Sequence, residues 1–158
     1  MKFLRVAVFL CAFYVPLAYA ETLTIEYAGG HYTGDVVNGL PHGTGIAVGP
    51  SGEKYVGEWK DGLPNGQGEV TMPDGASYAG AWQGGRMHGH GVMTWPDGGR
   101  YEGQFDRGKK HGLGIHRRTD GSQYVGEYKE GREWNGVVYL ASGEIDKTVT
   151  NGTFKSAD

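Results

Sequence analysis

The sequence has 158 residues, with 15 Lys and Arg against 18 Asp and Glu, which gives a net charge of −3 at pH 7. That length is enough for one domain, and the acidic balance argues against a dedicated nucleic-acid-binding protein, which is usually strongly basic. Cys11 is the only cysteine, so disulfides, thiolate metal sites and a thiol nucleophile are excluded for the chain beyond it.

The first 20 residues have the pattern of a secretory signal peptide. Lys2 and Arg5 precede a mostly apolar run at 6–17 and a small-x-small cleavage site at 18–20. The apolar run is too short for a membrane span of ~20 residues, although an uncleaved N-terminal anchor is the alternative interpretation. We therefore predict cleavage before Glu21 and an exported protein, periplasmic or secreted. Loss of the two basic residues leaves a net charge of about −5.

Beyond the leader, the sequence repeats itself every 23 residues. The clearest repeated position is a tyrosine, found at Tyr32, Tyr55, Tyr78, Tyr101 and Tyr124. A glycine follows two residues later and, in most units, a second aromatic residue four residues later. Since side chains alternate along a strand, these three positions share one face, and Asp-Gly segments mark the turns. The pattern predicts an all-β fold, an elongated single-sheet solenoid of about five 23-residue β-hairpin repeats.

The pattern Y-x-G-x-W/F-x-x-G, with a following G-x-G and an Asp-Gly turn, resembles the MORN repeat (membrane occupation and recognition nexus). The resemblance covers residues 32–143 in five units, which begin at 32, 55, 78, 101 and 124. Val36 stands where Trp or Phe is expected, and the fifth unit lacks the G-x-G. Because terminal repeats usually cap a solenoid, residues 21–31 are expected to form an N-terminal capping strand and residues 144–158 a C-terminal cap and tail.

The aromatic face of the repeats is the candidate contact surface for a partner. The rings have a structural role first, because a single sheet has little interior volume, and only their exposed edges are left for a ligand. The candidate groove residues are Tyr55, Trp59, Tyr78, Trp82, Tyr101 and Phe105. MORN arrays are commonly interaction modules, so the resemblance implies a non-enzymatic, exported binding or scaffolding protein with a protein partner. An accessory subunit or inhibitor of a secreted enzyme is an alternative, and self-association is left open.

A basic segment in the fourth unit supports a further alternative, a peripheral membrane protein that binds anionic lipid. Lys109 and Lys110 are expected at a hairpin tip, from which they could reach an anionic surface. The candidate contacts are Lys109, Lys110, Arg117 and Arg118. A solvated turn is the simpler interpretation, and the acidic charge of the whole chain opposes binding to anionic lipid.

Catalytic and metal-binding patterns are weak in this sequence. The aspartates of the Asp-Gly turns stand in different repeats rather than as a converging pair, and no G-x-S-x-G motif occurs. His88 and His90 could share a strand face, with His111 more distant. Equivalent positions of adjacent repeats lie ~10 Å apart, which is too far for two nitrogens to bind one zinc ion. We therefore predict no catalytic residue, no metal site and no cofactor.

Overall fold

The computed structural model describes residues 21–157, so the predicted signal peptide at 1–20 lies outside the described residues. Thirteen β-strands form one sheet in which each strand pairs only with its neighbours in sequence order. They are β1 (Glu21–Tyr27), β2 (Gly30–Val37), β3 (Leu40–Val48), β4 (Lys54–Lys60), β5 (Leu63–Thr71), β6 (Ser77–Gln83), β7 (Arg86–Thr94), β8 (Arg100–Asp106), β9 (Lys109–Arg117), β10 (Gln123–Lys129), β11 (Arg132–Tyr139), β12 (Ile145–Thr150) and β13 (Thr153–Ser156).

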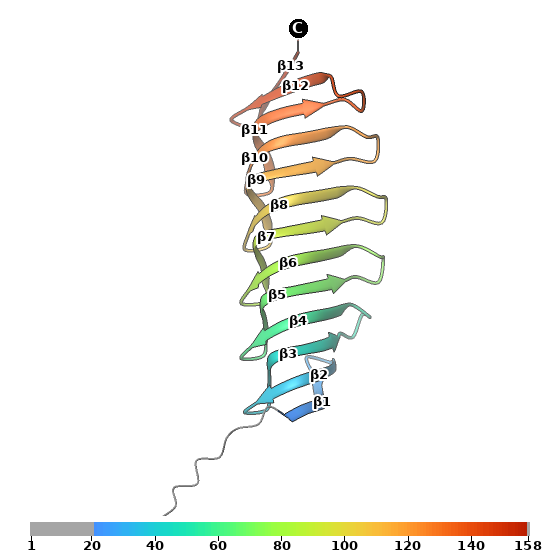
Figure 1. Ribbon diagram of the computed structural model, residues 1–158, viewed down its shortest axis with the longest axis vertical. Helices are drawn as coiled ribbons and strands as arrows, with labels where there is room; N and C mark the ends of the chain where they lie inside the picture. Colours follow the sequence, from blue (N-terminus) through green and yellow to red (C-terminus); the bar gives the residue numbers. More distant parts are fainter. Residues whose placement is uncertain (1–20, 158) are drawn as a thin grey trace, which may run out of the picture.

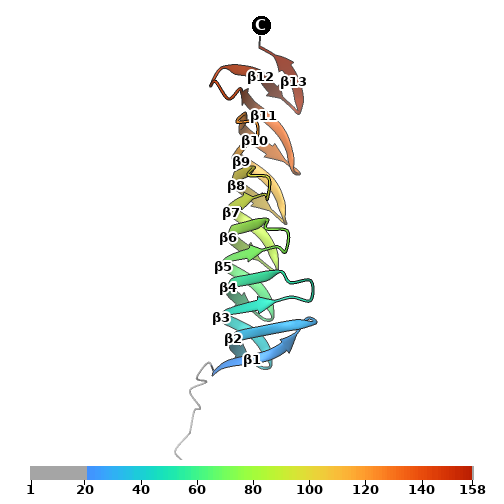
Figure 2. The same ribbon diagram turned by 90° about the vertical axis from the view of Figure 1, so that its right-hand side faces the viewer.

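All these strand pairs are antiparallel, and the sheet is a long stack that rises from β1 to β13 (Figures 1 and 2). Within residues 21–157 no helix is long and apolar enough to span a membrane. The prediction of an all-β, single-sheet solenoid is confirmed.

Two kinds of turn alternate along the sheet. A two-residue turn joins the strands of each repeat, as Asp61-Gly62 joins β4 to β5, with φ values of 50° and 83°. Positive φ at both positions defines a type I′ turn, which matches the twist of the paired strands. A longer loop joins each repeat to the next, and in one of these the Asp74 carboxylate accepts a hydrogen bond from the Ala76 N–H at 2.9 Å. Each repeat therefore presents a tight turn on one side of the sheet and a loop on the other (Figure 1).

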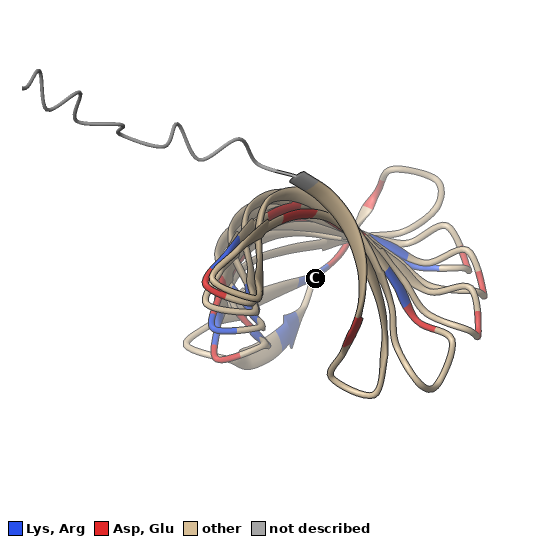
Figure 3. Cartoon of the chain, turned by 90° about the horizontal axis from the view of Figure 1, so that it is seen from below, with Lys and Arg blue, Asp and Glu red and all other residues tan. Residues whose placement is uncertain are grey.

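The strands bend at their centres, so the sheet forms a trough when viewed along its long axis (Figure 3). The bend lies at glycines that face each other across a strand pair, such as Gly57 and Gly68, and the pairing register shifts directly after them. A Cβ atom on Gly57 would lie 2.5 Å from the Gly68 Cα. Only glycine allows the two backbones to approach this closely, which explains why these glycines recur in every repeat.

The core is a continuous row of aromatic rings on the concave face of the trough. Tyr55 contacts Trp59 of its own repeat and Trp82 of the next repeat edge to face, with ring centroids 5.1 and 5.2 Å apart. The ring row runs through Tyr32, Trp59, Tyr55, Trp82, Tyr78, Phe105, Tyr101, Tyr128 and Tyr124. The Tyr55 hydroxyl donates to the Glu58 carbonyl oxygen at 3.0 Å. Each repeat is therefore held to the next by rings that interlock across the boundary.

The strands at the two ends extend this core beyond the ring row. Val36, where a ring is expected, packs against the core together with Tyr27 of β1. The Tyr27 hydroxyl donates to the Gly62 carbonyl oxygen at 2.8 Å, which ties β1 to the second repeat. At the other end, Val149 of β12 is 3% exposed, whereas β13 is exposed along its whole length.

Candidate functional site: the concave groove

Three columns of side chains line the concave groove beside the ring row. The first column lies opposite the repeated tyrosines and consists of Ala47, Val70, Met93, His116 and Val138. The second lies opposite Val36 and the second ring of each later repeat and consists of Pro41, Pro64, Met87, Lys110 and Glu133. The third begins each inter-repeat loop and consists of Gly49, Met72, Trp95, Arg118 and Leu140. The groove is therefore apolar through the third repeat and becomes basic in the fourth.

The second and third repeats form an apolar recess in the groove with a volume of about 300 Å³. The side chains that define this recess are Val70, Met72, Trp82, Met87 and Met93. The Trp82 indole N–H donates to the Gly68 carbonyl oxygen at 3.1 Å, which fixes the orientation of the ring. Flexible, polarisable methionine side chains can adapt to different shapes. The apolar recess can therefore bury an apolar side chain from outside the chain.

The six aromatic residues predicted as groove contacts all lie in the ring row. Five of them are at most 6% exposed, namely Tyr55, Trp59, Tyr78, Tyr101 and Phe105. Trp82 is the only one of the six that is partly exposed, and it lines the apolar recess together with the buried Tyr78. The sequence reasoning missed the methionines beside it, although the 23-residue spacing from Val70 to Met93 and from Pro64 to Met87 already aligned them in columns.

The fourth repeat places a basic residue in all three columns, Lys110, His116 and Arg118. The Lys110 Nζ lies 4.6 Å from the centroid of the Trp95 ring and 4.7 Å from that of Tyr101. These ring faces attract the ammonium group. Burial nevertheless lowers the pKa of Lys110 from its usual 10.5 to about 8. Lys110 is therefore a groove residue and not a surface lysine.

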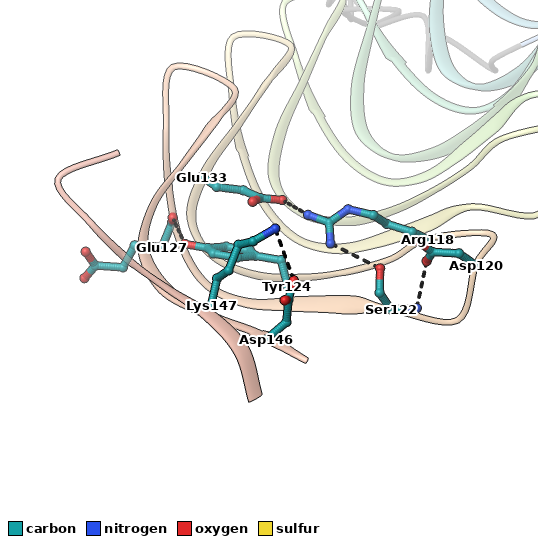
Figure 4. A network of polar contacts seen from close by, with 8 residues as sticks. All are labelled: Arg118, Asp120, Ser122, Tyr124, Glu127, Glu133, Asp146 and Lys147. Atoms are coloured by element: carbon teal, nitrogen blue, oxygen red, sulfur yellow. Dashed lines mark hydrogen bonds and ion pairs between the residues drawn. The ribbon is translucent and has the colours of Figure 1, made fainter. Parts of the chain in front are cut away.

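Arg118 pairs with Glu133 across the groove (Figure 4). The Arg118 Nη2 lies 2.7 Å from the Glu133 Oε1, and the same guanidinium donates to the Ser122 Oγ at 3.3 Å. The Glu133 side chain is only 14% exposed, so breaking this pair would leave a charge poorly solvated. Among the described residues Lys110 has no such partner, because no carboxylate lies within 4.0 Å of its ammonium group.

The four basic residues predicted as anionic-surface contacts do not share one surface. The hairpin tip is Arg107-Gly108, so the expected placement of Lys109 and Lys110 at the tip is wrong. Lys109 is the first residue of β9, and its Nζ lies 2.6 Å from the Glu130 Oε2 of the neighbouring hairpin. The side chain of Lys110, the next residue in the strand, points to the opposite face and lies in the groove. Strand alternation also separates Arg117, which is exposed on the other face, from Arg118, whose ion pair lies within the groove.

The histidines considered as metal ligands lie beside different residues of the neighbouring strand. The His88 Nδ1 lies 3.4 Å from the Asp106 Oδ1, and His90 lies opposite Gln104 in the neighbouring strand. Among the described residues, no group of three or more His, Cys, Asp or Glu side chains is arranged to hold a metal ion. That the protein has no metal site, no cofactor and no catalytic residue stays a prediction.

His116 is expected to make the stability of the fold depend on pH. Burial, reinforced by the nearby charges of Lys110 and Arg118 and opposed by Asp97, lowers the pKa of His116 from 6.5 to about 4. The unfolded chain therefore takes up this proton first as the pH falls, so the free energy of unfolding decreases between pH 6.5 and 4. We expect His116→Met, which copies Met93, to remove about 1–2 kcal/mol of that decrease, since partial solvation screens part of the shift.

Urea titrations of wild type and His116→Met at pH 7 and pH 4.5 measure the difference. The control is His31→Gln, because His31 is exposed beside Glu26. Equal loss of stability in wild type and in His116→Met would show that another group controls the response to acid.

An open stack of β-hairpins with a groove on its concave face is the architecture of a solenoid repeat protein. Proteins of this class typically bind partners along an extended concave surface. A family model described as the MORN repeat matches residues 32–54, 55–77, 78–100 and 101–123. The chain therefore belongs to the MORN repeat family. MORN repeats are a non-catalytic type of repeat, generally involved in protein or membrane binding. No curated protein matches the chain.

Proposed function

We propose that this protein is a non-enzymatic binding or scaffolding protein that holds a segment of another protein in its concave groove. The observation that carries the proposal is the apolar recess, in which Met72, Met87 and Met93 surround a hollow of about 300 Å³ next to Trp82. Aromatic residues and methionine are enriched at the centres of protein interfaces. Burying one large apolar side chain there contributes about 1.5–3 kcal/mol.

The groove favours an extended or helical segment over a compact ligand. Its three columns continue through neighbouring repeats, and each repeat advances the groove by ~10 Å. A bound segment can therefore contact several repeats at once, with a strong apolar contact at the recess and weaker contacts on either side. Such a segment could belong to a secreted enzyme, in which case the protein would act as its accessory subunit or inhibitor.

An anionic membrane is the alternative that the structure supports less. Binding to a lipid surface needs several basic side chains on one exposed face. Of the four candidates, Lys109 is paired with Glu130, and Arg118 is paired with Glu133. Lys110 lies among rings in the groove, which leaves Arg117 as the only one of the four that is exposed without an ion pair.

Export is proposed from the signal-peptide pattern at 1–20 alone, and it places the partner in the periplasm or outside the cell. Sequencing the N-terminus of the protein recovered from that compartment should find Glu21, whereas an intact Met1 would point to an anchor.

Photo-cross-linking in the native cells tests the groove. A benzoylphenylalanine at position 87 should form an adduct with one discrete protein, because this position lines the apolar recess. The same group at Val56, which is 42% exposed on the other face, should not. Met72 is 43% exposed, so Met72→Glu should leave the fold intact and abolish the adduct from position 87.

Adducts formed only from position 56, or adducts from position 87 that survive Met72→Glu, would place the contact surface elsewhere.

A further inference from the structure

A second hollow, of about 520 Å³, lies at the basic end of the groove. Its polar and aromatic wall includes Lys110, His116, Tyr128, Glu133 and Trp134. It is lined by the fourth and fifth repeats and by the β12–β13 turn and β13, and it differs from the apolar recess because charged groups face it. We name it the basic pocket.

Tyr128 lines the basic pocket and has a buried hydroxyl. The residue is 4% exposed, and its hydroxyl has no hydrogen-bond partner among the described residues. At the same position of other repeats, the Trp59 and Trp82 indole N–H groups donate to glycine carbonyl oxygens, and Phe105 has no polar atom. A buried hydroxyl without a partner is destabilising, and phenylalanine would avoid that cost. The Tyr128 hydroxyl is therefore suited to a partner from outside the chain.

Lys110 brings a second polar group without a protein partner. Proline or methionine occupies its column in the first three repeats, so the fold does not need a cation there. Its ammonium group lies over the faces of three rings and makes no hydrogen bond among the described residues. A carboxylate beside it would favour the charged form that burial disfavours. Arg118 is engaged with Glu133, and Arg132, which also lines the basic pocket, is exposed, so Lys110 is the half-buried cation without a carboxylate partner.

We propose that the basic pocket holds one acidic side chain of the bound protein segment, whose carboxylate accepts hydrogen bonds from the Lys110 ammonium and the Tyr128 hydroxyl. This inference rests on the proposed protein-binding groove and specifies what the partner must carry. The half-buried Lys110 cation and the neutral Tyr128 hydroxyl match a carboxylate, which accepts charge-assisted hydrogen bonds. Glu133 also lines the basic pocket and would repel a doubly charged phosphate, so a carboxylate is the better match.

The two hollows define a spacing in the partner. The apolar recess is built around the third repeat, whereas the basic pocket extends from Lys110 of the fourth repeat into the fifth. The two hollows therefore lie one to two repeats apart, at ~10 Å per repeat. An extended chain covers that distance in about three to six residues. The bound segment should therefore carry an apolar residue and an Asp or Glu about three to six positions apart if it is extended.

Selection from a display library of random 12-residue peptides tests the proposal on the whole exported chain. Peptides selected on wild type should be enriched in Asp or Glu at a fixed distance from an apolar residue. Lys110→Met copies Met87 of the third repeat and should bind a synthetic selected peptide at least about tenfold more weakly. Lys109→Met removes the same charge from the other face and should leave the affinity unchanged.

Tyr128→Phe separates recognition from folding. It should weaken the same peptide about fivefold or more, because a hydrogen bond to a charged group is lost. The free protein should keep or gain stability in urea, since the hydroxyl has no partner within the described chain. Replacing the acidic residue of the peptide by Gln should weaken wild type and leave Lys110→Met almost unaffected.

The failures of the two proposals are distinguishable. Selected peptides that require Met87 but carry no fixed acidic residue would overturn the carboxylate site and leave the protein-binding groove standing. A library that yields no peptide dependent on the groove would contradict both. Vesicles of anionic lipid that bind through Lys110, with no peptide selected, would replace the acidic side chain by a lipid phosphate and overturn the proposal.

Discussion

Replacing Tyr78 by alanine is expected to lower the free energy of unfolding by about 3–5 kcal/mol, in the range found for large buried aromatic residues. Tyr78 is 1% exposed, and its ring stands edge to face with Trp82 and Phe105 at centroid distances of 5.3 and 5.0 Å. The substitution interrupts the ring row at its middle. A single bent sheet has no second layer that could collapse into the gap.

Tyr78→Phe is the matched control for this prediction. It keeps the ring and removes only the hydrogen bond from the hydroxyl to the Ala81 carbonyl oxygen, which is 2.8 Å long, so it should cost about 0.5–1.5 kcal/mol. Urea denaturation followed by circular dichroism measures both variants. A loss below about 1 kcal/mol for Tyr78→Ala would show that the ring row is not the core.

Gly80→Ala is expected to destabilise the fold by about 3 kcal/mol or more, at the upper end of the range for overpacked sites. The added Cβ would lie 2.5 Å from the Gly91 Cα and 2.6 Å from the His90 carbonyl oxygen. Both are backbone atoms of the paired strand, so no side chain can move aside to make room. The two strands would have to separate at the bend, where the Tyr78 ring covers them.

Gly98→Ala is the control that separates close approach from backbone conformation. Gly98 has a φ of +92° and no atom within 4 Å of an added Cβ, so its cost is the conformational strain of about 1–2 kcal/mol. Thermal unfolding of both variants under the same conditions gives the comparison. If both substitutions destabilise the fold equally, glycines at the bend such as Gly80 would be required only for their backbone conformation and not for the close approach of the strands.

The fold was predictable because every repeat solves the same steric problem. Tyr55 and Gly57 recur at 23-residue intervals. Together they determine which strand face is buried, where the strands bend and where the ring row runs. The position of the rings across the repeat boundary was not predictable in detail. That Tyr55 contacts Trp82 as closely as Trp59 depends on the twist between hairpins, which one repeat does not encode.

The groove was less predictable because its character depends on how columns line up between repeats. Lys109 and Lys110 are adjacent in sequence, yet one pairs with Glu130 and the other lies among rings. The number of basic residues in this segment predicted that both lysines belong to one surface patch. Aligning Lys110 with Met87 and Pro64 would have placed it in the groove, whereas its contacts with the rings of Trp95 and Tyr128 needed the three-dimensional structure.

The most direct test of a partner segment in the groove is the ¹³C-methyl spectrum of the methionines. Apart from Met1, the chain has only Met72, Met87 and Met93, and all three line the apolar recess. Each methyl group therefore reports on the groove alone. Titration with a peptide selected on wild type should shift all three signals with one common saturation curve. A peptide that binds, as shown by calorimetry, while all three methyl signals stay unmoved would contradict the account.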